Sequence, residues 1–184
     1  WHTLSLHDAL PIYWGAGYFD LTQKGEVAVQ VPFGNRTASV SLLDVVRGIE
    51  RRGMAMPVLL RIENVLDSQL SLLNESFRRA IDTSGYQGNY RGVFPIKVNQ
   101  QAQVIEEITR FGQRYDHGLE AGSKGELMIA LAMIQSKESL IICNGYKDGE
   151  FIDLGLRSVQ LGYKVFFVIE TPSELQIILE RSKA

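Results

Sequence analysis

The feature that most constrains the fold of this chain is a regular alternation of two kinds of segment, which begins after Pro57. Short apolar runs rich in Val, Ile and Phe alternate with longer stretches in which apolar residues recur every three or four positions. The first pattern is typical of buried strands and the second of amphipathic helices. Such an alternation predicts βα units on a parallel sheet. The five predicted strands are Val58–Ile62, Val93–Val98, His117–Glu120, Leu140–Asn144 and Val165–Glu170.

The segments between these strands carry the helix pattern. Leu66–Ile81, Val104–Phe111 and Phe151–Val159 each have apolar residues at helical spacing. Leu127–Ile134 is apolar nearly all round, which predicts a deeply buried helix. The nearly continuous apolar strands indicate a sheet that is covered on both faces. Five units are compatible with an open doubly wound sheet or with part of an eight-stranded barrel, and the periodicity does not choose between them.

Three stretches of the chain differ in pattern. Residues 1–12 have no initiator Met and no clean periodicity, so we interpret them as an artefactual or disordered segment, with an ordinary N-terminal arm as the alternative. Residues 13–56 form a predicted N-terminal prelude. Residues 57–184 carry the strand–helix alternation and form the predicted α/β domain.

The prelude contains one predicted strand and one predicted helix. Glu26–Val31 alternates polar and apolar residues, as a half-buried strand does. Ser41–Arg52 has the pattern of a helix, with Ser41 as its N-cap and Gly53 as its C-cap.

Composition excludes several classes of function. The net charge of -2 is spread along the chain without a basic block, so neither nucleic acid nor an anionic membrane is an expected partner. The single cysteine, Cys143, rules out an internal disulfide, and it lies in an apolar run where a small buried hydrophobe is expected. No run is long enough to cross a membrane, and the N-terminus does not have the pattern of a signal peptide. We therefore expect a cytoplasmic protein whose partners are small molecules or other proteins.

Polar residues stand at the ends of four predicted strands. They are Lys97, Glu120, Asn144 and Glu170. Because active sites of parallel α/β folds form at the carboxyl ends of the strands, these side chains are predicted to surround one mouth. The alternative is that polar residues mark the point where any strand reaches the surface.

Lys97 is the most informative of these residues. It stands at two-residue spacing from Val93 and Pro95 in an apolar stretch, which predicts a desolvated amine with a lowered pKa. Such an amine is the nucleophile needed to form an imine with an aldehyde cofactor. Pro95 predicts a local irregularity of the strand beside it. The competing interpretation is a lysine that reaches solvent from the end of a strand.

Two loops at the predicted mouth have alternative readings. Glu120 either holds the lysine or is a surface acid at the start of a loop. Ser123 and Glu126 have the spacing of a capping box at the start of a helix. The glycine-rich stretch Gly145–Gly149 either cradles an anion at a helix N-terminus or is simply a turn.

Several segments resemble those of one enzyme family, the biosynthetic arginine decarboxylases. Phe94-Pro95-Ile96-Lys97-Val98-Asn99-Gln100 is similar to the segment that carries the family's cofactor lysine. Further resemblances occur in the family's order and cover nearly everything from Tyr13 onward, whereas residues 1–12 do not fit. The other resembling segments are Trp14–Phe19, Gly118–Leu127, Ile142–Asp148 and Glu170–Leu175.

The resemblance implies a fold. The family looks like the alanine-racemase class of pyridoxal-phosphate enzymes, in which a (β/α)8 barrel is followed by a C-terminal β-domain. The chain would then hold the N-terminal part of the barrel, with about five βα units and without the β-domain. Val58–Ile62 would be the first barrel strand, and Lys97 would end the second.

The resemblance also implies a function. Lys97 would carry pyridoxal phosphate, and the enzyme would convert L-arginine to agmatine and carbon dioxide in polyamine biosynthesis. Glu120 and Asn144 would support the cofactor. Magnesium is a further cofactor of the family, although the sequence shows no ligand set for it. The full-length protein would be a homo-oligomer.

The same family places further site residues in later strands. We therefore expect the chain by itself to be catalytically inactive. One alternative is a decarboxylase of the same fold class that acts on ornithine, diaminopimelate or a related amino acid. The other is a non-catalytic βα binding domain in which Lys97 is merely solvated.

Overall fold

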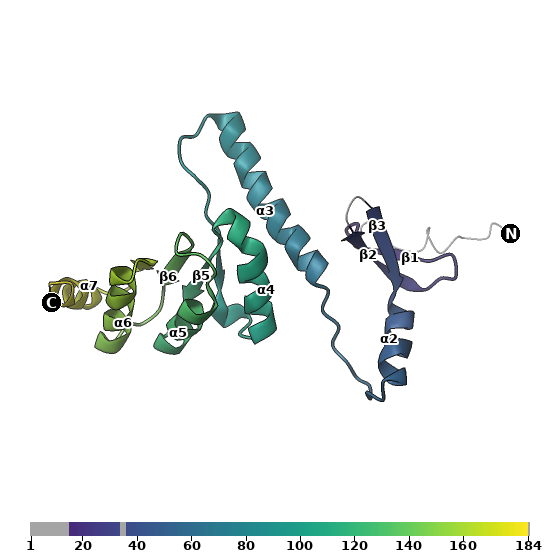
Figure 1. Cartoon of the computed structure of the whole chain (residues 1–184). Coiled ribbons are helices and arrows are strands. Elements are labelled where there is room, and N and C mark those ends of the chain that lie inside the picture. The colour runs from purple at the N-terminus through teal and green to yellow at the C-terminus, as the bar shows by residue number, and fades with distance from the viewer. Residues whose placement is uncertain (1–14, 34–35, 184) are drawn as a thin grey trace. The chain divides into compact units, whose positions relative to one another are not determined.

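The computed structural model describes residues 15–33 and 36–183, which form two compact units (Figure 1). The first unit extends to Val65, and the second begins at Leu66. The unusual segment 1–12 lies outside the described residues, and the boundaries predicted for the prelude and the α/β domain stay predictions. Among the described residues, no helix is both long and apolar enough to span a membrane.

The first unit is a small antiparallel sheet with one helix. Its strands are ordered β1-β2-β3, and the register pairs Phe19 with Val29 and Val29 with Val40. Val29 and its neighbour Ala28 are buried, which makes β2 the centre of this unit. The predicted strand is thereby confirmed. The elements are β1 (Phe19–Leu21), β2 (Val27–Phe33), β3 (Arg36–Ser41) and α2 (Leu42–Arg51).

Helix α2 begins at its predicted N-cap, Ser41, and its C-cap is Arg52, one residue before the predicted Gly53. The Ser41 hydroxyl accepts a hydrogen bond from the Asp44 N–H at 3.4 Å, which caps the first turn. Arg52 is the last half-helical residue, and Gly53 follows it with φ of +78°. A left-handed residue directly after a helix is commonly glycine because glycine has no Cβ to clash with the backbone.

No strand forms over Val58–Ile62, where the sequence predicts one. Leu59 is 75% exposed in this segment, and α3 begins immediately after it. An apolar run becomes a strand only when a neighbouring strand pairs its N–H and C=O groups, and no described strand does so here. The five predicted βα units are therefore four.

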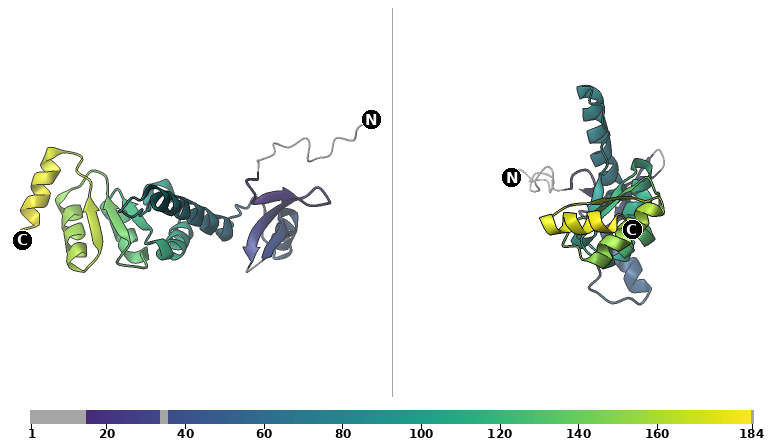
Figure 2. Two further views of the ribbon diagram at one scale, coloured as in Figure 1. Left: turned by 90° about the horizontal axis from the view of Figure 1, so that it is seen from above. Right: turned by 90° about the vertical axis from the view of Figure 1, so that its left-hand side faces the viewer.

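The second unit is built on a parallel sheet with the strand order β4-β5-β6-β7. Helix α3 precedes the sheet, and one helix follows each strand. Figures 1 and 2 show α4 to α7 following one another along the sheet in chain order. The elements are α3 (Glu63–Ser84), β4 (Val93–Pro95), α4 (Ala102–Gly112), β5 (Gly118–Ala121), α5 (Lys124–Met133), β6 (Leu140–Cys143), α6 (Gly149–Gln160), β7 (Lys164–Phe167) and α7 (Pro172–Arg181).

The core of this unit lies between one face of the sheet and helices α4, α5 and α6. Leu119 and Ile141 are register partners on adjacent strands, and both are fully buried. They pack with Ile105, Leu127 and Phe151 from the three helices. Each such side chain contributes roughly 1.5–3 kcal/mol by leaving water.

The opposite face of the sheet is less covered than the sequence predicts. Phe166 on β7 is 56% exposed, and Ile142 on β6 is only partly buried. Apolar residues on both faces of a strand allow both faces to be buried, but the layers that cover them must come from other segments. Among the described residues, only the helix-bearing face has that layer.

Helix α5 is also less buried than its composition predicts. Leu127 and Ala130 are inaccessible to solvent, yet Met128 is 61% exposed and Ile129 is 37% exposed. The helix packs on the core through Leu127, Ala130, Leu131 and Met133, whereas Met128 and Ile129 lie on its outer side. An apolar sequence therefore did not specify which faces of α5 are covered.

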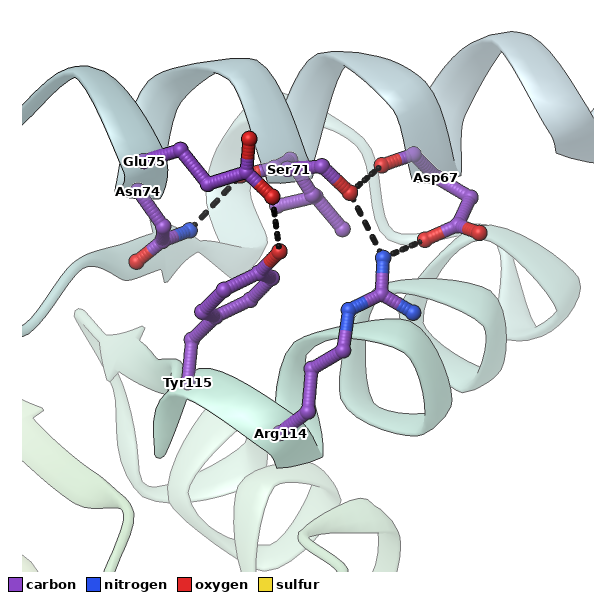
Figure 3. A network of polar contacts seen from close by, with 7 residues as sticks. Asp67, Ser71, Asn74, Glu75, Arg114 and Tyr115 are labelled. Carbon is purple, nitrogen blue, oxygen red and sulfur yellow. Dashed lines mark hydrogen bonds and ion pairs between the residues drawn. The ribbon is translucent and has the colours of Figure 1, made fainter.

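Helix α3 is held by a polar network at the end of the sheet where β5 begins (Figure 3). Arg114, in the 3-10 turn η2 (Gln113–Tyr115) before β5, donates to Asp67 and to the Ser71 hydroxyl, the latter at 2.6 Å. The Tyr115 hydroxyl donates to Glu75 at 3.2 Å. This network fixes α3 against the turn that leads into β5, away from the carboxyl ends of the strands.

Replacing Ile141 with Ala should lower the free energy of unfolding by about 2–5 kcal/mol, because it leaves a cavity beside Leu119. Leu59→Ala is the matched control, since Leu59 is 75% exposed. Urea unfolding followed by circular dichroism measures both. Equal losses in the two variants would contradict the location of the core.

Candidate active site

Strand β4 ends at Pro95, earlier than its apolar pattern predicts. The parallel ladder with β5 runs only to the pair Pro95 and Glu120, and a 3-10 turn, η1 (Ile96–Val98), follows. Proline has no N–H to donate to a ladder, so the predicted irregularity beside the lysine is found. Lys97 consequently lies in the turn and not in a strand, and its side chain is 56% exposed.

The turn brings Lys97 to the carboxylate of Glu120. The Lys97 Nζ and Glu120 Oε1 atoms are 2.9 Å apart, and the Glu120 side chain is 14% exposed. The direct side-chain interaction with Glu120, and then its negative charge, raise the pKa of Lys97. The charges of Glu126 and Glu170 act in the same direction.

The lowered pKa that the sequence predicts for Lys97 is therefore wrong. An apolar sequence around a lysine lowers its pKa only if the amine is buried among those apolar groups. Here η1 turns the amine out of the core and toward carboxylates, so attraction outweighs desolvation.

Glu120 is shielded from solvent at the oxygen that faces Lys97. This Oε1 atom has the Lys97 ammonium, 2.9 Å away, as its partner, and no other described group donates to it. A carboxylate oxygen can accept more than one hydrogen bond, so a bound ligand with an N–H or O–H group could donate to Glu120 beside the lysine.

The loops after β5 and β6 meet at a pair of glycines. The Asn144 N–H donates to the Ala121 carbonyl at 2.9 Å, so Asn144 begins its loop beside the end of β5. A Cβ on Gly145 would lie 2.3 Å from the Gly122 carbonyl oxygen, and Gly145 also has φ of +157°. Only glycine permits so close an approach of the two backbones. Asn144, partly buried, thus stands at the same edge of the sheet as Glu120.

The loop after β6 is a turn rather than an anion cradle. Asp148 caps α6 by accepting the Phe151 N–H at 2.8 Å, so the helix N-terminus already has an anionic partner. Lys147, in the same loop, points inward: its Nζ lies 3.2 Å from Glu174 Oε2, and the two side chains are 0% and 2% exposed.

Sequence reasoning missed this buried ion pair. The one signal was the capping-box spacing of Thr171 and Glu174, which matches that of Ser123 and Glu126. Burial by itself would raise the pKa of Glu174, but the N–H groups of Glu170 and Lys147 and the Lys147 ammonium hold that pKa below its ordinary value.

Cys143 has the predicted role of a small buried hydrophobe. It is inaccessible to solvent in the core, and burial raises the pKa of its thiol to about 12. Since the thiolate is the nucleophilic form, this cysteine is chemically inert in the folded protein.

Comparison with known proteins agrees with this arrangement. Residues 70–184 match the family described as "Pyridoxal-dependent decarboxylase, pyridoxal binding domain". The chain belongs to this family. The match begins within α3 and includes the whole parallel sheet, with Lys97, Glu120 and Asn144.

The similar curated proteins are biosynthetic arginine decarboxylases, as the sequence motifs predict. That of Thermosynechococcus vestitus is 44% identical over 171 residues, which cover 93% of this chain and 27% of the relative. That of Gloeobacter violaceus is 43% identical over 183 residues, which cover 97% and 28%. The chain thus spans little more than a quarter of the length of these relatives.

Solved structures confirm the fold class. The biosynthetic arginine decarboxylase SpeA from Campylobacter jejuni aligns with a TM-score of 0.86 and 31% identity, over 94% of this chain and 28% of that one. A diaminopimelate decarboxylase from M. jannaschii aligns with a TM-score of 0.60 and 21% identity, over 92% of this chain and 33% of that one, which shows a shared fold alone. The α/β units are thus part of the barrel of the alanine-racemase-like class.

The Glu174 carboxylate should make the free energy of unfolding depend on pH in the acidic range. Its folded-state pKa lies below the ordinary 4.5, so its contribution is complete above that pH and is lost as the pH falls through the folded-state pKa. The natural protein should therefore be more stable than Glu174→Gln above pH 4.5, and this difference in unfolding free energy should shrink as the pH falls below that value. Chemical denaturation at a series of pH values measures it.

Glu138→Gln is the matched control for this experiment. Pairing with Lys164 also lowers the pKa of Glu138, but its side chain is 61% exposed, so solvent screens the pair. The acid-dependent narrowing should be smaller for Glu138→Gln and should vanish at high salt. A Glu174→Gln difference that is constant with pH would contradict the assigned shift.

Proposed function

We propose that the complete gene product is a pyridoxal-phosphate-dependent lyase that decarboxylates L-arginine to agmatine, for polyamine biosynthesis, with Lys97 as the lysine that carries the cofactor. The observation that carries the proposal is the half-exposed amine of Lys97, held 2.9 Å from the shielded carboxylate of Glu120 at the carboxyl end of the sheet. Membership in a pyridoxal-binding family supports it.

The residues present suit the cofactor. A bound pyridoxal phosphate would supply an electron sink for the bond to the departing carboxylate. Lys97 offers an amine at the strand ends, and Glu120 offers a shielded oxygen that is paired with that amine and can accept a further hydrogen bond from a ligand. We assign Glu120 and Asn144 to the support of the cofactor, because both lie at the edge of the sheet where Lys97 emerges.

Glu120 has two roles in this proposal. Its charge holds the Lys97 side chain toward the mouth and keeps the amine protonated, and that proton must leave before the amine can attack an aldehyde. Glu120 therefore orients the lysine and controls the proton on Nζ.

Arginine is favoured as the substrate because the similar curated relatives are named arginine decarboxylases. A decarboxylase acting on another basic amino acid is the second candidate, and the shared fold of the diaminopimelate decarboxylase is compatible with it. A non-catalytic binding domain is less consistent with the pairing of Lys97 and Glu120.

The proposal has three further features. The described residues contain no group of three or more His, Cys, Asp or Glu side chains that could hold a metal ion, so magnesium has no assigned ligands here. A homo-oligomer and a cytoplasmic location stay predictions from the sequence.

Lys97→Ala should abolish covalent attachment of the cofactor. Pyridoxal phosphate is added to the complete gene product, the imine is reduced with borohydride, and the modified lysine is identified by peptide mass spectrometry. Lys124→Ala is the matched control, because Lys124 is also a half-exposed lysine paired with a glutamate, Glu150. We expect label on Lys97 in the natural protein and in the control. Label that persists elsewhere in Lys97→Ala, or never appears on Lys97, would overturn the assignment.

Glu120→Gln should shift the pH dependence of that labelling. Because Glu120 raises the pKa of Lys97, its removal lowers that pKa and yields the free amine at a lower pH. The midpoint of the rate of labelling against pH should therefore move down, whatever the maximum rate. Glu150→Gln, which removes the partner of Lys124 instead, should leave the midpoint unchanged. An unchanged or higher midpoint in Glu120→Gln would contradict the role of Glu120.

A further inference from the structure

Two glutamates occupy equivalent positions in the second unit. Glu126 lies three residues after the N-cap Ser123 of α5, and Glu174 lies three residues after the N-cap Thr171 of α7. In each case the N-cap hydroxyl accepts the glutamate N–H, at 3.2 Å in α5 and 3.4 Å in α7. Both carboxylates are buried, with exposures of 9% and 2%.

The two carboxylates share an unusual set of partners. In a capping box the glutamate accepts the N–H of its own N-cap residue. Here one oxygen accepts the N–H of the residue before the N-cap: Gly122 donates to Glu126 Oε2 at 2.7 Å, and Glu170 donates to Glu174 Oε2 at 2.9 Å. Each carboxylate therefore holds the loop that enters its own helix.

The second oxygen of each carboxylate reaches the preceding loop. Gln100, after β4, donates its side-chain amide to Glu126 Oε1 at 3.0 Å. Lys147, after β6, donates its backbone N–H to Glu174 Oε1 at 3.1 Å. Glu126 thus joins the loops after β4 and β5, and Glu174 joins the loops after β6 and β7.

The Glu174 junction has an additional charge. The Lys147 ammonium lies 3.2 Å from Glu174 Oε2 and also donates to the Gly145 carbonyl, so the loop between Asn144 and the start of α6 is held at both its backbone and its side chain. A fully buried ammonium is very costly without such partners. The pair is consequently a fixed geometric element and not a surface ion pair.

We propose that Glu174, together with Lys147, is a positioning residue of the decarboxylase site that sets the loops after β6 and β7, while Glu126 independently sets the loops after β4 and β5. The mouth would then be assembled from two halves, each fixed by its own glutamate, which meet where the Asn144 N–H donates to the Ala121 carbonyl and Gly145 contacts Gly122. One half carries Lys97 and Glu120, and the other carries Asn144 and Glu170. The catalytic consequence rests on the function proposed above, whereas the loop-fixing itself does not.

Glu174→Gln and Glu126→Leu should break the two junctions. Glu174→Gln offers one acceptor oxygen where two backbone N–H groups require two, and it also leaves the Lys147 ammonium uncompensated. Leucine is used at position 126 because Gln100 can turn its own amide oxygen toward a glutamine there, whereas Glu126→Leu leaves the Gly122 N–H and the Gln100 amide without their acceptor. Asp153→Asn is the matched control, since it removes a half-exposed ion pair with Arg181 between α6 and α7 without touching a mouth loop.

The first measurement is hydrogen–deuterium exchange in the complete gene product under native conditions. Glu174→Gln should speed exchange at the backbone of Lys147 and Glu170 by about tenfold or more and leave the loop containing Gln100 unchanged. Glu126→Leu should show the reverse pattern. Exchange that rises everywhere together, or in neither loop, would overturn the proposal of two separate halves, whatever the protein catalyses.

The second measurement separates positioning from general destabilisation. At temperatures where all variants are folded, Glu126→Leu should reduce borohydride-trapped label on Lys97, whereas Glu174→Gln should retain it and lose about tenfold or more in kcat for arginine. If both variants lost label on Lys97 and kcat in the same proportion, the glutamates would be structural residues and not positioning residues. If the natural protein neither labels Lys97 nor releases carbon dioxide, the proposed function fails, and exchange alone decides the loop-fixing.

The double variant Glu174→Gln with Lys147→Met gives a final check. It removes the uncompensated charge but not the shortage of acceptor oxygens. Its stability should recover relative to Glu174→Gln alone, while fast exchange at Glu170 and the low kcat persist. Recovery of exchange and kcat together with stability would show that the ion pair acts through stability only.

Discussion

The parallel ladder from β4 to β7 is the constraint on which the rest of the second unit depends. Parallel strands cannot be joined by tight turns, so each strand must be followed by a crossover that returns along the outside of the sheet. All four carboxyl ends therefore lie at one edge. That arrangement brings Lys97, Glu120 and Asn144 to the same edge of one sheet, although they come from three separate segments of the chain.

Local sequence signals predicted helix and strand ends well where the interacting groups lie within a few residues of each other. The predicted N-caps Ser41 and Ser123 cap their helices, and Pro95 ends its own strand. Such features depend on neighbours in the chain and are readable from it. The resemblance of the motif around Lys97 likewise pointed to the family to which the chain belongs.

The features that the sequence did not predict depend on distant partners. Val58–Ile62 has the composition of a strand but no described neighbour to pair with, and Met128 is apolar but lies on the outer side of α5. The pKa of Lys97 went the opposite way to its apolar surroundings because a carboxylate from the next strand reaches it. Lys147 and Glu174 are 27 residues apart, and nothing between them indicates that they meet. In each of these cases the outcome depended on contacts with distant residues and not on the local composition.

The close approach of Gly122 and Gly145 has a consequence for how such a site can vary. Most of the mouth is lined by side chains, which substitution can lengthen, shorten or recharge. Between the second and third strands of the sheet, however, the separation is set by two bare backbones in contact, and no side chain mediates it. The distance between the two loops at that point is therefore fixed by the backbone. Substitutions of the side chains around this point could change the specificity of the site, but they would not change the distance between the two loops.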